Sequence, residues 1–202
     1  GTKQIQYYKN AYSDSTACEQ KTFYVRQITF DSQGGSRVEP QLIWTTYNSL
    51  IPGAAVQCAV TEPQKPVREG YTFGGWYKDK KFKTKVTSIS KNTAKNVTLY
   101  AKWIKVTKCK APANMKLRNS KAKTMAVSYK AVSGAKGYEI SYATNSKFKS
   151  AKKVRTAAKS KSISKLKKGK TYYVRVRAYK VDSTGAKIYG SYSKAAKVKI
   201  KK

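Results

Sequence analysis

The sequence predicts a mainly β protein with two unlike domains, and three observations carry that prediction. Helical periodicity is weak along the chain, whereas short runs of β-branched and aromatic residues recur between Gly, Pro, Asn, Ser and Lys residues. The 202 residues are 40 % hydrophobic and 12 % aromatic, which is enough apolar material for packed cores. The charge also changes along the chain: residues 1–104 hold 15 basic and 7 acidic side chains, whereas residues 105–202 hold 29 and 2.

Four strands are expected in the first half of the chain. Each is an apolar or aromatic run between turn-forming residues, and the first run is followed by the glycine pair Gly34-Gly35, which marks a turn. The expected strands are Phe23–Asp31, Leu42–Tyr47, Tyr71–Tyr77 and Val97–Trp103.

The second half is expected to hold seven strands, spaced as a β-sandwich requires. The clearest is Thr171–Tyr179, because its side chains alternate between two faces. One face carries Tyr172, Val174, Val176 and Ala178, and the other carries Tyr173, Arg175, Arg177 and Tyr179. The remaining strands are a short one near Met115–Leu117, then Thr124–Tyr129, Gly137–Ala143, Lys152–Thr156, Ser160–Ile163 and Ala195–Ile200.

The same alternation in Gly137–Ala143 turns Glu139 outward. If this strand neighbours Thr171–Tyr179, Glu139 lies close to Arg175 or Arg177. An exposed ion pair of this kind would stabilise the fold by at most about 1 kcal/mol. Glu139 is therefore expected to balance the charge of a neighbouring arginine and not to act as a catalytic acid.

Residues 105–110 are predicted to be a linker. The segment is basic and runs into Ala111-Pro112-Ala113, where proline disfavours helix. Cys109 lies in this segment, where it would be unpaired and could be exposed.

The second half resembles a known family. The runs "KAVSGAKGYEISYATNSKF", "LKKGKTYYVRVRAYK" and "YGSYSKAAKVKI" are similar to the fibronectin type III domains on surface proteins of Gram-positive gut bacteria. The resemblance covers residues 111–202 and implies a seven-stranded β-sandwich. It also implies that Tyr129 stands where these domains usually carry a core tryptophan. Leu166, Gly169 and Tyr172 match the tyrosine corner, in which a phenol hydroxyl holds upstream backbone.

The first half resembles another family. The runs "ITFDSQGGS", "PVREGYTFGGWYKDKKF" and "NVTLYAKW" are similar to the Listeria–Bacteroides repeat, which is related to the B repeat of internalin. The resemblance implies a small β-grasp-like module over residues 23–104, with Trp76 and Trp103 anchoring its core. Residues 1–22 then form an N-terminal extension or the end of a preceding unit. The segment Leu42 to Gln64 departs from the family as an insertion.

The composition argues against an enzyme. There is no His, which excludes His-based acid/base catalysis, catalytic triads and His-ligated metals. The nine acidic residues are scattered without a persuasive pair, so neither a catalytic site, a metal nor a cofactor is expected. The longest weakly polar stretch, Leu50 to Val60, is too short to span a membrane.

Two cysteines fall in the first half. If the chain is exported, Cys18 and Cys58 are candidates for a disulfide worth about 2–4 kcal/mol. Buried free thiols are the alternative.

The strongest chemical feature is positive charge. The net charge is +35, and the 44 basic residues include only seven Arg. Because Lys is a hydrated point charge, this surface suits diffuse attraction to an anionic wall polymer or host glycan rather than specific nucleic-acid recognition. The alternative is that the lysines only keep the protein soluble.

Two groups of residues are candidates for a ligand surface. Tyr173, Arg175, Arg177 and Tyr179 interleave rings and cations as a stacking surface does, although cross-strand packing explains the pattern equally well. Trp44 and Tyr47 lie in the insertion, where a module-specific surface could sit.

These features predict a non-enzymatic stalk or adhesion segment of a secreted or cell-surface bacterial protein whose signal and anchor are outside this chain. The first alternative is a specific host-protein-binding module, engaging a receptor or immunoglobulin through the insertion or a sheet edge. The second is an accessory module of a larger secreted enzyme. The oligomeric state stays open.

Overall fold

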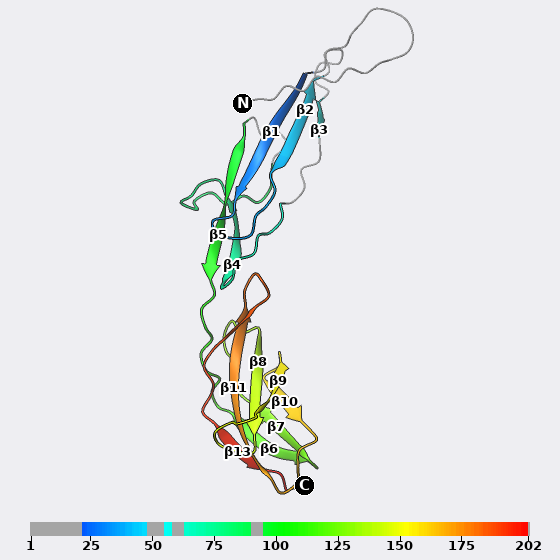
Figure 1. Cartoon of the computed structure of the whole chain (residues 1–202), viewed down its shortest axis with the longest axis vertical. Coiled ribbons are helices and arrows are strands. Elements are labelled where there is room, and N and C mark those ends of the chain that lie inside the picture. Colours follow the sequence, from blue (N-terminus) through cyan, green and yellow to red (C-terminus); the bar gives the residue numbers. More distant parts are fainter. Residues whose placement is uncertain (1–21, 48–54, 58–62, 90–94, 202) are drawn as a thin grey trace, which may run out of the picture. The chain divides into compact units, whose positions relative to one another are not determined.

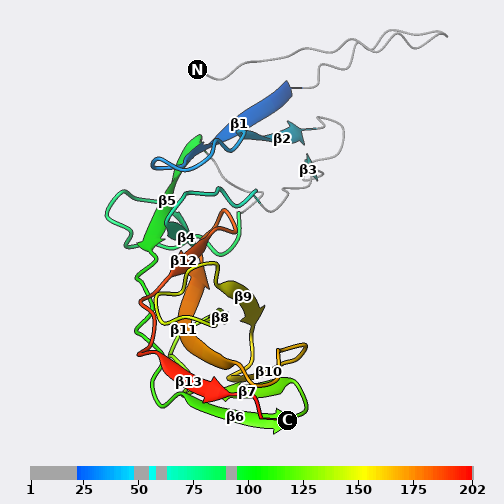
Figure 2. The same ribbon diagram turned by 60° about the horizontal axis from the view of Figure 1, so that its bottom comes forward.

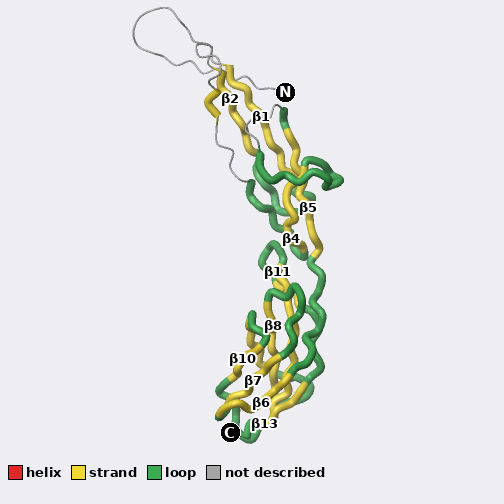
Figure 3. The backbone as a smooth tube through the Cα atoms, turned by 180° about the vertical axis from the view of Figure 1, so that it is seen from behind, coloured by secondary structure: helices red, strands yellow, loops and turns green. Residues whose placement is uncertain are grey.

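The computed structural model describes residues 22–47, 55–57, 63–89 and 95–201, and only the backbone within residues 22–25, 43–47 and 55–57. The described residues form strands and loops without a helix (Figure 3). The chain divides into two compact units, residues 1–68 with 72–104 and residues 69–71 with 105–202.

The first unit is built on one five-stranded sheet with the order β3-β2-β1-β5-β4 (Figure 1). β1 pairs antiparallel with β2 and parallel with β5. The four strands expected from the sequence are confirmed to within two residues, whereas β3 is only three residues long and was not foreseen. The strands are β1 Thr22–Asp31, β2 Gln41–Tyr47, β3 Ala55–Gln57, β4 Tyr71–Tyr77 and β5 Val97–Lys105.

An aromatic cluster fills the core of the first unit. The ring of Trp76 lies 4.9 Å from that of Phe30 and 5.4 Å from that of Phe73. Trp103 packs beside them and donates its Nε1–H to the carbonyl of Ser32 at 2.8 Å. A side chain at Gly35 would collide with the Trp103 ring, so the turn after β1 needs glycine there. The expected anchoring by Trp76 and Trp103 is confirmed.

The second unit is a β-sandwich. One sheet has the order β10-β7-β6, and the other has the order β12-β11-β8-β9, with β13 also pairing with β11 (Figure 2). β12 and β13 pair with opposite ends of β11, so they are two parts of one interrupted last strand. The strands are β6 Lys116–Lys121, β7 Thr124–Ser128, β8 Gly137–Ala143, β9 Lys152–Thr156, β10 Ser160–Ile163, β11 Thr171–Val181, β12 Lys187–Tyr189 and β13 Ala196–Lys199.

The sandwich core has the composition that the alternation predicts. Tyr172, Val174, Val176 and Ala178 of β11 are all buried against the other sheet. The tyrosine corner is confirmed, because the Tyr172 hydroxyl accepts a hydrogen bond from the backbone N–H of Lys167 at 3.0 Å. Tyr129 is a core aromatic as expected: its ring lies 4.7 Å from that of Tyr138, and its hydroxyl donates to the Ala158 carbonyl. Burial raises the pKa of Tyr129.

Cys109 corrects the expectation of an exposed thiol. Its side chain is buried, unpaired, and part of the core of the second unit. A side chain at Gly190 would collide with the Cys109 backbone, so residue 190 must be glycine for these two segments to lie together. The predicted linker therefore contributes a core residue, because its backbone runs beside the interrupted last strand.

Candidate functional site

The predicted stacking surface lies on β11, on the face opposite the sandwich core. Tyr173, Arg175, Arg177 and Tyr179 share this face, as the alternation predicts. All four are half-buried, so the expectation of an open face is wrong. Aromatic side chains from two other segments cover the arginines.

The covering rings and the two arginines form a stacked column, which comprises Phe148, Arg175, Tyr192, Arg177 and Tyr189. The guanidinium of Arg175 lies 4.1 Å from the ring centres of both Phe148 and Tyr192. That of Arg177 lies 3.8 Å from the ring of Tyr189 and 4.7 Å from that of Tyr192. Each contact of this kind stabilises by about 0.5–2 kcal/mol, depending on how well water is excluded.

The interruption of the last strand places two of these rings. Tyr189 and Tyr192 are three residues apart, which in a regular strand would put them on opposite faces. Between β12 and β13 the chain instead follows β11 through spaced hydrogen bonds, from Gly190 N–H to the Ala178 carbonyl at 2.8 Å and from Ser193 N–H to the Val176 carbonyl at 2.7 Å. Both tyrosines can then cover the arginine face.

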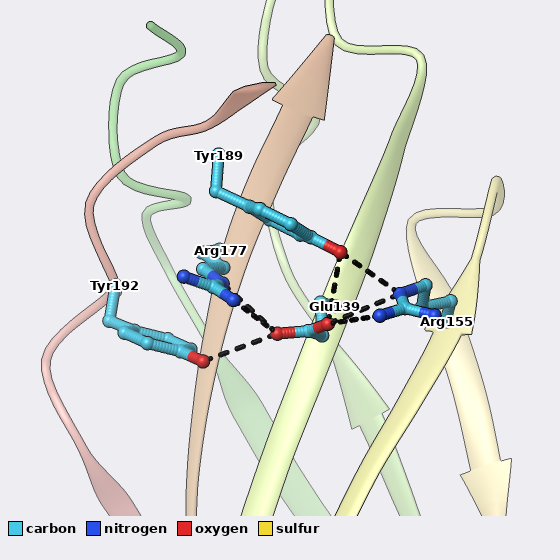
Figure 4. A network of polar contacts seen from close by, with 5 residues as sticks. All are labelled: Glu139, Arg155, Arg177, Tyr189 and Tyr192. Carbon is cyan, nitrogen blue, oxygen red and sulfur yellow. Dashed lines mark hydrogen bonds and ion pairs between the residues drawn. The ribbon is translucent and has the colours of Figure 1, made fainter. Parts of the chain in front are cut away.

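Glu139 contacts three members of this column, Arg177, Tyr189 and Tyr192 (Figure 4). The register of β8 places it between Arg177 of β11 and Arg155 of β9. Arg177 Nη2 donates to Oε1 at 2.7 Å, and Arg155 Nε donates to Oε2 at 3.1 Å. The hydroxyls of Tyr189 and Tyr192 complete the set at 3.1 Å and 3.3 Å.

The environment of Glu139 corrects a second expectation. The predicted neighbourhood with Arg177 is confirmed, but Glu139 is only 1 % exposed, so the pair is not a surface pair. Burial by itself would raise the pKa of Glu139, but the hydrogen bonds and charge of Arg177, with Tyr189 and Arg155, outweigh burial and hold the pKa below its usual value. A carboxylate held by four donors stays ionised and acts as a structural counter-charge.

Asp182 is the other acidic residue of residues 105–202, and it too is used internally. It lies in the turn after β11, where its Oδ1 accepts bonds from the Thr184 hydroxyl at 2.6 Å and from the backbone N–H groups of Thr184 and Ala186. These bonds, that of the Thr184 hydroxyl first, lower the pKa of Asp182. Both acids are therefore committed to the fold.

The lysines of residues 105–202 have no acidic partner in the described part of this region. Within the described part of residues 105–202, the ion pairs all use arginine and none uses lysine. Five exposed lysines line one groove of about 940 Å³, which was not predicted from the sequence. Tyr173 is the one predicted ligand-surface residue among the groove's lining residues.

The other predicted site residues lie in the first unit. Trp44 and Tyr47 belong to β2, where their backbones lie opposite Val25 and Thr22, and their side chains are outside the described residues. Cys18 and Cys58 are also outside the described residues, so their disulfide stays a prediction.

Two further findings concern the described residues only. They contain no group of three or more His, Cys, Asp or Glu side chains that could hold a metal ion. They also contain no helix long and apolar enough to cross a membrane.

Two family models match the chain. Residues 27–102 match the Listeria-Bacteroides repeat domain, and residues 110–190 match the fibronectin type III domain. Both resemblances predicted from the sequence are confirmed.

Two curated relatives come from Evansella cellulosilytica. A protein described as a Gly-rich membrane protein is 38 % identical over 77 residues, which are 38 % of this chain and 8 % of that protein. A second, described as a membrane protein, is 33 % identical over 79 residues, which are 39 % of this chain and 10 % of that protein. The chain thus spans a tenth or less of the length of these relatives.

Solved structures of fibronectin domains are more distant. The chicken CNTN1 FN1-FN3 domains are 17 % identical, with 81 % of this chain and 43 % of that chain covered and a TM-score of 0.42. The FN5 domain of Drosophila Lar is 20 % identical, with 46 % and 98 % covered and a TM-score of 0.37.

Proposed function

Because the chain carries a Listeria-Bacteroides repeat domain followed by a fibronectin type III domain, we propose that it is a non-enzymatic segment of a secreted or cell-surface protein that attaches to an anionic polymer. Both domains are of non-catalytic module types, and both fit an extracellular setting. The attachment is electrostatic and uses the basic surface of the fibronectin type III domain.

One observation carries the proposal. Residues 105–202 have a net charge of +27, and their two acids, Glu139 and Asp182, are engaged inside the fold. The lysines therefore face solvent without counter-charges from this region. A surface of this kind attracts polyanions over a distance of about one Debye length, roughly 8–10 Å at physiological salt.

The chemistry of lysine favours an extended polymer over a single small anion. Lysine ammonium groups are hydrated point charges on flexible stems, so they bind phosphate, sulfate or carboxylate groups without a fixed bidentate geometry. Many weak contacts along one chain add up, and each releases counterions. Anionic wall polymers and acidic host glycans both have this chemistry.

Sedimentation of the full chain with isolated Gram-positive cell walls tests the proposal. Walls with and without teichoic acid are compared, beside immobilised mucin and serum proteins, between about 50 and 500 mM salt. We expect retention on intact walls or mucin at low salt and its loss at high salt, because ions screen exposed charges. Retention that survives high salt, or capture of one serum protein at every salt concentration, would replace this function with a protein-binding one.

A further inference from the structure

We propose that the lysine-lined groove of the second unit is a binding site for an acidic polysaccharide. This inference rests on the proposed function and names the groove as the place where the polymer attaches. The groove is formed within residues 142–152, from the end of β8 to the start of β9, and residues 164–173, from the end of β10 into β11. Its volume of about 940 Å³ is large enough for several sugar units of a chain that passes through it.

The groove concentrates positive charge. Among its fifteen lining residues are five lysines and no acid, and each of the five is exposed. The lysines are Lys149, Lys152, Lys165, Lys167 and Lys170. Any anion that enters therefore meets cations from both walls.

The two acids of residues 105–202 do not neutralise the groove. Asp182 follows the far end of β11, nine residues from Tyr173, which corresponds to about 30 Å along a strand. This distance is about four Debye lengths at physiological salt. Glu139 lies nearer on β8 but is neutralised by Arg155 and Arg177.

Hydrogen bonds fix the backbone of both walls. In the first wall, the Asn145 amide donates to the Lys149 carbonyl and accepts from the Lys149 N–H, both at 3.0 Å. In the second, the Tyr172 hydroxyl holds the N–H of Lys167 at 3.0 Å, and the Gly169 N–H donates to the Ile200 carbonyl at 2.7 Å. The lysine stems thus project from set positions, which lowers the entropy lost on binding.

The remaining lining residues favour a sugar chain over a simple phosphate chain. Sugar hydroxyls need hydrogen-bond partners, and the face of a sugar ring packs on an aromatic ring. The half-buried ring of Tyr173 is available at the groove. Hydroxyl and amide groups come from Thr144, Asn145, Ser150, Ser164 and Thr171.

Two triple variants of the full chain test the site. The groove variant carries Lys149→Gln, Lys165→Gln and Lys167→Gln. The matched control carries Lys116→Gln, Lys130→Gln and Lys194→Gln, which are exposed and lie outside the groove lining. Both variants lower the net charge from +35 to +32, so they differ only in where the charge is removed. Circular dichroism and thermal melting confirm that each is folded.

The probes are a size-defined, sulfated heparin oligosaccharide and an inorganic polyphosphate of similar total charge. We expect the groove variant to bind the oligosaccharide about tenfold or more weakly and the control to change less than about threefold. We also expect the slope of log affinity against log salt to fall by about 2 to 3 in the groove variant, roughly one unit for each lysine lost.

A third variant, Tyr173→Ala, tests the assignment to sugar. We expect it to weaken binding of the oligosaccharide but not of polyphosphate, because only the sugar uses the ring. Equal weakening by both triple variants would overturn the groove while leaving polyanion attachment intact. The polysaccharide assignment would be overturned if polyphosphate bound as tightly as the oligosaccharide and depended equally on the groove lysines. If the unmodified chain binds neither probe at low salt, the proposed function itself fails.

Discussion

The stacked column and the groove both combine basic and aromatic side chains, yet only the column contains an acidic partner for its basic groups. The column packs Arg175 and Arg177 between aromatic rings and supplies Glu139 as a buried counter-charge. The groove carries five exposed lysines and no acid. The basic groups of the column are therefore neutralised inside the fold, whereas those of the groove can attract an anion from outside.

Loss of the Glu139 counter-charge is expected to destabilise the second unit most. Glu139→Gln should destabilise the second unit by about 3 kcal/mol, because it leaves the largely buried Arg177 without its partner. Calorimetry of the full chain measures this as a lowered melting temperature of one transition.

An exposed ion pair provides the matched control for Glu139. Arg37 and Glu39 lie 2.9 Å apart with side chains 81 % and 74 % exposed, so Glu39→Gln should cost at most about 1 kcal/mol. Equal effects of the two substitutions would contradict the structural role of Glu139.

The next effect concerns the ring between the two arginines. Tyr192→Ala should destabilise the second unit by about 2–3 kcal/mol, because it removes a stacking partner of both guanidinium groups. Tyr192→Phe keeps the ring and loses only the 3.3 Å contact of the hydroxyl with Glu139, so it should cost less than about 1 kcal/mol. Urea unfolding of both variants checks this order. If Tyr192→Phe lowered the unfolding free energy as much as Tyr192→Ala, the role of stacking would be disproved.

The stability of the second unit should also depend on pH through Glu139. The pKa of Glu139 is lowered in the folded state, so its carboxylate stabilises the fold above the ordinary pKa of about 4.3, and this is lost as the pH falls through the folded-state value. The difference in unfolding free energy between the unmodified chain and Glu139→Gln should stay constant from about pH 7 to 5 and shrink below about pH 4. A difference that grows on acidification would contradict the lowered pKa.

The smallest effect is expected in the groove. Replacing Lys149, Lys165 and Lys167 with Gln should change the unfolding free energy by less than about 0.5 kcal/mol, because these side chains are exposed and lack ion pairs in the described structure. Chemical denaturation measures this. A loss of several kcal/mol would mean that the lysines support the fold rather than face a ligand.

Most of the strands could be predicted from the sequence because each depends on a local pattern, whereas the three-residue strands β3 and β12 were not predicted. The alternation in β11 and in β8 indicated both elements and their neighbourhood. The burial of Glu139 could not be predicted in the same way, since it depends on Tyr189 and Tyr192 covering one face after the last strand is interrupted at Gly190. The only sequence signal was two tyrosines three residues apart around a glycine.

The groove was missed for a different reason. Its two walls, residues 142–152 and 164–173, meet because β8 and β11 are paired, so no single stretch of sequence contains the site. The lysine-rich run "SKLKKGK" indicated charge but not where the charge would converge. Tyr173 was singled out for its place on β11, although it lines the groove whereas its strand neighbour Arg175 belongs to the column.

Lysine footprinting of the full chain identifies which lysines contact the ligand. Surface lysines are acetylated with and without the sulfated oligosaccharide, and the rate at each site is read by mass spectrometry. If the groove binds the oligosaccharide, Lys149, Lys165 and Lys167 are selectively protected, whereas Lys116 and Lys130 are modified at unchanged rates. Two results would contradict the groove as the binding site: equal protection of all exposed lysines, or no protection of the groove lysines when binding is saturated.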